Sequence, residues 1–301
     1  MGTDLGGIAP PAGSGTSGPV TTARFGGHLR ISRTFLLRVV FGSIGAGVAL
    51  FLVYLAGVFG VYDLGYALYL LPPRGRALTT GLITTLGFMV VVMPLGFGLG
   101  FAFGWARTSR AWPARAVATT YVEFFRGMPP IVLIAFAFLI TIVVFRGNDR
   151  IDIFALATGA GVMALAAHSG AYQAEIIRAG ILSVPTGQIE AAEAVGMSRG
   201  TILARITLPQ MFRISLPALG NEFASLIKDT SLLSTIGALD LTFQGKNLSA
   251  VLAVGGGNLD LVIIIWAEIA FLYFVITFVV SRALQAIERR FRVPGLEAAQ
   301  L

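Results

Sequence analysis

Charged and hydroxyl side chains interrupt an otherwise apolar part of the sequence at residues 228–231. Lys228, Asp229, Thr230 and Ser231 supply a cation, an anion and two hydroxyl groups. Together these groups can bind the carboxylate and ammonium groups of a solute. Charged residues within membrane helices are energetically costly, so they mark candidate functional sites. The alternative is that Lys228 and Asp229 pair with neighbouring helices and hold the fold.

Two further polar groups lie in the same kind of setting. Asn221 and Glu222 begin the second half of one apolar stretch, where they either line a cavity or cap a helix. Glu123 and Arg126 are three residues apart and share a helix face. This pair either neutralises itself or meets a neighbouring helix.

The segment after Arg126 predicts a broken helix. Gly127 is followed by Pro129 and a second proline, which remove two backbone donors. Broken helices often line substrate paths in transporters. Residues 123–129 are therefore a candidate gate, with a simple kink and a structural ion pair as the alternative.

Other polar positions favour structural roles. Glu175 and Arg178 are spaced for a salt bridge, and His168 is expected to pack rather than relay protons. Glu268 has no partner in the sequence, so it either faces a cavity or pairs across a subunit interface. Gly96, Gly100 and Gly104 form a small-residue face that permits close helix packing.

Composition indicates which elements must position these side chains. The chain has 301 residues, of which 55% are hydrophobic and 12% charged, and its mean hydropathy is +0.81. Soluble domains carry about 25% charged residues. The sequence therefore predicts an all-α integral membrane protein and excludes a soluble single-core enzyme. The absence of cysteine excludes a thiol nucleophile, and two histidines argue against a metal centre.

Six apolar stretches are long enough to cross a bilayer as helices. They cover residues 35–60, 77–106, 116–145, 153–180, 212–238 and 259–287. Residues 1–33, rich in Gly, Pro, Ser and Thr, are expected to form a disordered cytoplasmic tail.

Basic residues orient these stretches. With the N-terminus inside, 15 of the 22 Lys and Arg residues fall in cytoplasmic segments and five in outside loops. This asymmetry predicts that both termini are cytoplasmic. The net charge of +7 then reflects membrane orientation rather than nucleic-acid binding.

A polar segment at residues 181–211 separates the fourth and fifth stretches on the predicted cytoplasmic side. Glu190 to Ala194 is strongly helix-forming. Gly196 permits a left-handed bend, and a second short helix is expected from Arg199 to Ile206, before Pro209. Two short helices would form a handle for a soluble partner.

The spacing in this segment resembles the EAA loop of ABC importer permeases. In that family the loop docks into a groove of the ATPase subunit, so the resemblance implies an ATPase-coupling site. Its residues here are Glu190, Ala191, Ala192, Gly196, Ile206, Leu208 and Pro209.

Three more motifs resemble the polar amino acid permeases of the histidine, glutamine and arginine type. They are Tyr121-Val-Glu-Phe-Phe-Arg-Gly-Met-Pro129, Ser169-Gly-Ala-Tyr-Gln-Ala-Glu175 and Leu226-Ile-Lys-Asp-Thr-Ser-Leu232. Met128 replaces the threonine usual in the family, residues 130–135 lack the usual glutamine, and Glu268 replaces an apolar residue.

The resemblance implies the type I ABC importer transmembrane fold, with five core helices plus one extra N-terminal helix. The expected domains are the tail at 1–33, an extra helix and external loop at 34–76, a permease domain at 77–288 and a cytoplasmic tail at 289–301. The coupling loop occupies 186–211 within the permease domain.

The implied function is ATP-driven import of a polar amino acid across the cytoplasmic membrane of a prokaryote. Expected partners are ABC ATPase subunits, a second permease copy or a sister permease, an extracytoplasmic substrate-binding protein and the lipid bilayer. No nucleic acid is expected. The chain is expected to bind no cofactor or metal and to have no catalytic residue, with ATP used by the partner ATPase.

Missing motifs limit the alternatives. No phosphate-binding Gly-x4-Gly-Lys-Ser/Thr loop occurs, since Gly245-Lys246 lacks the first glycine and is followed by Asn247. One rival is an ion-driven secondary amino acid transporter, which predicts an inverted repeat and no docking loop. Another is an intramembrane enzyme or a receptor-like partner, which predicts a polar catalytic cluster or a large extramembrane domain.

Overall fold

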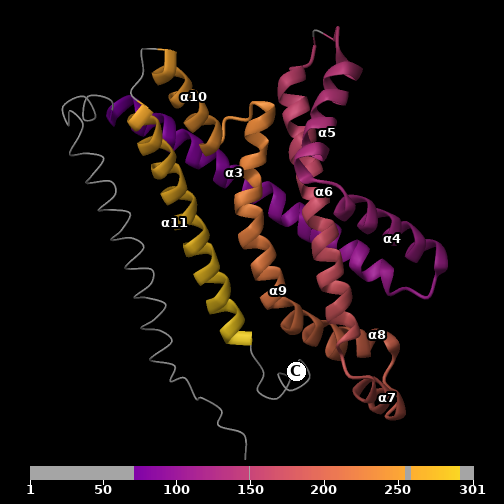
Figure 1. Cartoon of the computed structure of the whole chain (residues 1–301). Helices are drawn as coiled ribbons and strands as arrows, with labels where there is room; N and C mark the ends of the chain where they lie inside the picture. The colour runs from indigo at the N-terminus through magenta and orange to yellow at the C-terminus, as the bar shows by residue number, and fades with distance from the viewer. Residues whose placement is uncertain (1–70, 149, 255–258, 292–301) are drawn as a thin grey trace, which may run out of the picture. The chain divides into compact units, whose positions relative to one another are not determined.

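The computed structural model describes residues 71–148, 150–254 and 259–291, and all regular elements in these ranges are helical (Figure 1). The predicted tail at 1–33, the apolar stretch at 35–60 and most of the C-terminal tail lie outside the described residues. Helix α11 (Leu259–Phe291) extends the last predicted stretch by four residues, into the segment expected to be tail.

Two long helices, α3 (Leu71–Arg107) and α6 (Ile153–Leu182), pack against each other along much of their length. The predicted glycine face lies at this contact. A Cβ atom added at Gly100 would lie 2.6 Å from the Cβ of Gln173, and one added at Gly104 would lie 2.6 Å from the Ala174 carbonyl oxygen. The prediction of close helix packing is confirmed, and the packing occurs within the chain.

The predicted stretch at 116–145 is two helices joined at a sharp bend. Helix α4 (Trp112–Gly127) ends before Met128, and α5 (Pro130–Phe145) leaves at an angle of 103°. Met128 and Pro129 have extended backbone conformations, because Pro129 restricts the residue before it and neither proline can donate a helical hydrogen bond. The predicted break is therefore confirmed.

The predicted stretch at 212–238 also needs correction. Helix α9 (Leu208–Asp229) gives way to a 3₁₀-helix, η2 (Thr230–Ile236), which stops at Gly237 with φ of +81°. In the described ranges, three helices are long and apolar enough to cross a membrane, namely α3, α6 and α11, and the bent α4–α5 pair can make a fourth span. Polar residues such as Arg213, Asn221 and Glu222 make α9 less apolar than these helices.

The polar segment between α6 and α9 forms the two predicted short helices. Helix α7 (Thr186–Ala194) is followed by Gly196 with φ of +80°, as the predicted left-handed bend requires. Helix α8 (Arg199–Ile202) then continues through a π-helical turn, η1 (Leu203–Thr207), directly into α9. The second helix therefore does not stop before Pro209, which instead occupies the first turn of α9.

Two apolar clusters hold these elements. The larger joins α3, α5, α6, α9 and η2 through residues that include Val92, Ile134, Leu165 and Leu226. The second joins α3 and α11 to α10 (Leu241–Val254) through Leu78, Leu241, Ile265 and Ile269. Helix α6 lies against α3, α4, α5, α9 and η2.

Candidate coupling and transport sites

The coupling segment presents most of its motif to the surroundings. Glu190, Ala191 and Gly196 are exposed, whereas Ala192 is buried against the chain. Ile206 and Leu208 are half-buried and Pro209 is exposed. Val195, next to the bend, leaves 77% of its surface exposed, so an apolar side chain marks the tip of the segment.

The turn between α3 and α4 lies beside the coupling segment. A hollow of about 240 Å³ is lined by Arg110 from this turn and by Glu193, Arg199 and Thr207 from the coupling segment, among others. The end of α3 and the start of α4 are therefore close to the two short helices.

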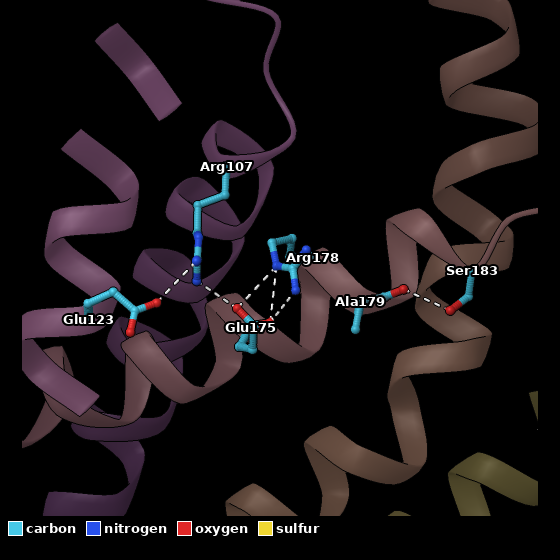
Figure 2. A network of polar contacts seen from close by, with 6 residues as sticks. All are labelled: Arg107, Glu123, Glu175, Arg178, Ala179 and Ser183. Carbon is cyan, nitrogen blue, oxygen red and sulfur yellow. Dashed lines mark hydrogen bonds and ion pairs between the residues drawn. The ribbon is translucent and has the colours of Figure 1, made fainter. Parts of the chain in front are cut away.

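An ion cluster ties α3, α4 and α6 together near this end (Figure 2). The Arg107 guanidinium, on the last residue of α3, donates to Glu175 Oε2 at 2.6 Å and to Glu123 Oε1 at 3.2 Å. Arg178 Nε donates to both Glu175 oxygens at 3.1 Å. The predicted Glu175–Arg178 salt bridge is confirmed, and Glu123 meets a neighbouring helix rather than Arg126.

Two more contacts join α4 to α6. The Tyr121 hydroxyl donates to the Ala167 carbonyl oxygen at 2.7 Å. The Arg126 guanidinium lies 5.1 Å from the centre of the Tyr172 ring, within the range of a cation–π interaction. Tyr121 and Arg126 of the motif at 121–129 therefore contact Tyr172 of the motif at 169–175 or the segment just before it.

The helix break follows directly from this contact region. Gly127 and Pro129 are exposed, and a Cβ atom added at Gly127 would meet no atom within 4 Å. The α4 side of the break is held by polar contacts, while Leu133 and Ile134 of α5 are buried in the core. The role of residues 123–129 as a gate stays a prediction.

A polar chain connects α6 to the candidate pathway on α9. Gln173 Nε2 donates to Ser169 Oγ at 3.0 Å, and Ser169 Oγ donates to Glu222 Oε1 at 2.9 Å. Gln173 is fully buried and its Oε1 has no hydrogen-bond partner in the described part of the chain. Glu222 is half-buried and Asn221 is exposed. Both residues lie inside α9 and so do not cap a helix, and the hydrogen bond from Ser169 joins Glu222 to α6.

The polar group at 228–231 spans the junction of α9 and η2. Lys228 is exposed, and Asp229 and Ser231 are half-buried. Thr230 is fully buried, and its hydroxyl donates back to the Ile227 carbonyl oxygen at 2.7 Å. Solute contact by this group stays a prediction, with Thr230 the member least available for it.

Glu268 does have a partner within the chain. Arg74 Nη2 lies 3.1 Å from Glu268 Oε1, and the Arg74 side chain is only 10% exposed. The expectation that Glu268 faces a cavity or pairs across a subunit interface is replaced by an α3–α11 ion pair. His168 is buried and its ring lies 5.1 Å from that of Tyr172, consistent with the predicted packing role.

Sequence reasoning missed several polar residues. Arg107 is one of the basic residues that orient the chain and has no motif around it, and Gln173 lies inside the motif at 169–175 without a role predicted for it. Asp240 is fully buried, and its carboxylate accepts hydrogen bonds from the Phe243 backbone amide and the Tyr273 hydroxyl. An aspartate just before an apolar helix is a capping signal that could have revealed this residue. In the described ranges, no group of three or more His, Asp or Glu residues is placed to hold a metal ion.

Comparison with known families accounts for this arrangement. Residues 93–293 match the family described as binding-protein-dependent transport system inner membrane component. The chain belongs to this family. The match runs from α3 through the coupling segment to the end of α11. It establishes that the chain is a component of a membrane transport system.

Curated relatives extend the similarity over most of their length. The chain is 39% identical over 213 residues to the L-cystine transport system permease protein TcyB of Bacillus subtilis, covering 71% of this chain and 86% of the relative. It is 38% identical over 222 residues to the glutamine transport system permease protein GlnP of Escherichia coli K12, covering 73% and 95% respectively.

Solved structures support the predicted fold. A crystal structure of an amino acid ABC transporter with histidines matches 76% of this chain and 99% of its own, with 33% identity and a TM-score of 0.62. An inward-facing structure of the MetNI methionine ABC transporter matches 74% and 99% with a TM-score of 0.60 and 20% identity, which speaks for the fold alone. The chain has the type I ABC importer transmembrane fold.

Proposed function

We propose that this chain is the permease subunit of an ATP-driven importer of polar amino acids. The observation that carries the proposal is the coupling segment, in which two short helices meet at a left-handed Gly196 and present Glu190, Ala191 and Val195 outward. A secondary transporter has no need of such a docking segment. The names of the two relatives, which concern glutamine and L-cystine, support the amino acid class.

In this proposal each kind of subunit has its own role in transport. Two permeases, either two copies of this chain or this chain with a sister, would form the pathway, and two ATPases would bind the coupling segments. An extracytoplasmic binding protein would deliver the substrate. This chain would bind no ATP and carry no catalytic residue, and both of its termini would lie in the cytoplasm of a prokaryote.

In this mechanism, ATP binding closes the ATPase pair and moves the two coupling segments. Because α6 leads into the coupling segment and contacts α3, α4, α5 and α9, movement of the segment would shift α6 and these neighbours. The helices would thereby pass from an inward-open to an outward-open arrangement. Return to the first arrangement would release the substrate inside.

We assign the substrate pathway to the polar residues of α9 and the start of η2. Glu222 and Asp229 are two helical turns apart and so share one face of α9, with Asn221 and Lys228 beside them. These groups, with Ser231, would meet the ammonium and carboxylate ends of a zwitterion. The hydrogen bond from Ser169 fixes the orientation of the Glu222 carboxylate.

The test is purification of the tagged chain from its native membranes, with identification of the proteins that accompany it. We expect an ATPase in the complex, and we expect Gly196→Asp to lose it while the chain still inserts. A Cβ at Gly196 meets no atom within 4 Å of this chain, so no clash within the chain is expected, although the left-handed backbone strains any side chain placed there.

Gly196→Asn is the matched control, because asparagine and aspartate have nearly the same size and both tolerate the left-handed conformation. Greater loss of the ATPase with aspartate than with asparagine would show that added charge disrupts docking. A chain that purifies alone and transports in vesicles without ATP would contradict the proposal and favour an ion-driven carrier.

A further inference from the structure

Arg107 joins two carboxylates that belong to different helices. Its side chain is 14% exposed and lies between Glu175 of α6 and Glu123 of α4 (Figure 2). Arginine suits this place because its planar guanidinium carries several donors in a fixed geometry. Arg107 is also the last residue of α3, so one side chain links three helices.

The two contacts of Arg107 differ in strength. Glu175 is 27% exposed, lies 2.6 Å from Arg107 and is held from the other side by Arg178. Glu123 is 63% exposed and makes a single contact at 3.2 Å. Exposed ion pairs contribute little to stability. The α3–α6 link is therefore firm, whereas the link to α4 can open and close at small cost.

The firm side of the cluster leads to the coupling segment. From Glu175, α6 continues for seven residues to Leu182, a rise of roughly 10 Å. Ser183 closes this end by donating its hydroxyl to the Ala179 carbonyl oxygen at 2.8 Å (Figure 2), and α7 starts three residues later at Thr186. A displacement of α7 therefore reaches Glu175 through the short turn at 183–185 and the last two turns of α6.

The releasable side leads to the helix break. Glu123 lies one turn before the end of α4, and Met128 and Pro129 follow directly. Two further α4–α6 contacts, through Tyr121 and Arg126, lie within one turn of Glu123. The polar contacts of α4 are thus gathered in one short region just before the break.

We propose that Arg107 is a positioning residue for energy coupling, which links movement of the coupling segment, carried by α6, to α4 and the helix break. This inference rests on the proposed function. Arg107 touches neither the predicted pathway on α9 nor the exposed motif residues of α7. It acts by making α4 move together with α6.

The experiment uses the complex of this chain with its ATPase in proteoliposomes, supplied with the binding protein. The probe is whichever of labelled L-glutamine, L-cystine or L-arginine the wild type imports. The measured quantity is substrate imported per ATP hydrolysed. Arg107→Ala is expected to keep ATP hydrolysis and to lower this ratio about fivefold or more, within the range of known couplings between sites.

Three variants separate positioning from folding. Arg115→Ala removes an exposed arginine of α4 and is expected to leave the ratio unchanged. Glu123→Gln keeps the size of an exposed side chain and weakens only the releasable contact by removing its negative charge, so it is expected to fold and to lower the ratio by a smaller factor. Arg107→Lys is expected to recover part of the loss, because lysine retains the charge without the two-pronged geometry.

The outcomes distinguish this inference from the proposed function. If the wild type imports substrate with ATP and both Arg107→Ala and Glu123→Gln keep its ratio, the inference is wrong and the function stands. If Arg107→Ala does not assemble, an unchanged ratio in Glu123→Gln overturns the inference. If the wild type shows no ATP-dependent import of any of the three probes, both the proposed substrate class and the inference fail.

Discussion

At the scale of single residues, the close contact between α3 and α6 leaves no room for side chains at Gly100 and Gly104. A Cβ at residue 100 would lie 2.6 Å from the Cβ of Gln173 and 3.1 Å from the Gly170 carbonyl oxygen. Backbone atoms cannot move aside as the end of a flexible side chain can. The identity of these residues is therefore fixed by helix separation rather than by contact with a solute.

We expect Gly100→Ala to destabilise the protein by about 1–3 kcal/mol, the usual cost of overpacking. Gly98→Ala is the matched control, because Gly98 is on the same helix, is exposed and has no atom within 4 Å of its Cβ position. Thermal unfolding of both variants in lipid nanodiscs measures the difference. Equal stability of the two would contradict the close contact at Gly100.

At the scale of elements, the sequence predicted helix existence better than helix ends. Uniform apolar character predicted α3, α6 and α11 to within several residues, and Gly196 and the prolines marked two real interruptions. The switch from α9 to η2 was missed, because the Leu-Leu-Ser-Thr-Ile run is compatible with several helical forms. The α4–α6 contacts were also out of reach, since they join residues 46 or more apart whose spacing carries no local signal.

The bend between α4 and α5 is expected to survive loss of its prolines. In Pro129→Ala/Pro130→Ala, two regained hydrogen bonds would contribute about 1 kcal/mol each to a straight helix. Straightening would withdraw Leu133 and Ile134 from the core and would break the polar contacts between α4 and α6. Because lipid can cover apolar side chains, the cost of withdrawal is lost packing rather than exposure to water. The lost packing and polar contacts together are expected to outweigh the gain.

Spin labels at the ends of α4 and α5 test this expectation. The natural chain has no cysteine, so Trp112→Cys with Phe145→Cys gives a single labelled pair in either background. The separation should agree between the two backgrounds. A straight helix would place the labels roughly 20 Å further apart, and that result would assign the bend to the prolines alone.

At the scale of the whole described chain, large apolar side chains are widely exposed. Examples are Val90 at 73%, Phe136 at 64%, Leu139 at 59% and Val279 at 58%. A water-soluble protein rarely exposes so much contiguous apolar surface. Lipid or neighbouring subunits must cover these side chains, which agrees with a membrane transport component.

Leu139→Lys is expected to reduce membrane insertion, because a lysine at the centre of a spanning helix costs about 2.5–3.5 kcal/mol on insertion scales. Val195→Lys is the control, since Val195 is exposed in the coupling segment and outside the predicted spans. The carbonate-resistant fraction of each variant measures insertion. Full insertion of Leu139→Lys would mean that this part of α5 faces water or protein rather than lipid.

The π-helical turn η1 fixes the rotation of the coupling segment about the axis of α9. Such a turn holds one residue more than an α-helical turn over nearly the same length, and each residue of an α-helix advances by about 100°. Deleting Ala204 would smooth the helix and turn α7 and α8 through a similar angle, so that their outward face would point elsewhere. Chain length between Ile202 and Leu208 is therefore under a geometric constraint, and an insertion or deletion there is less acceptable than a change of side chain.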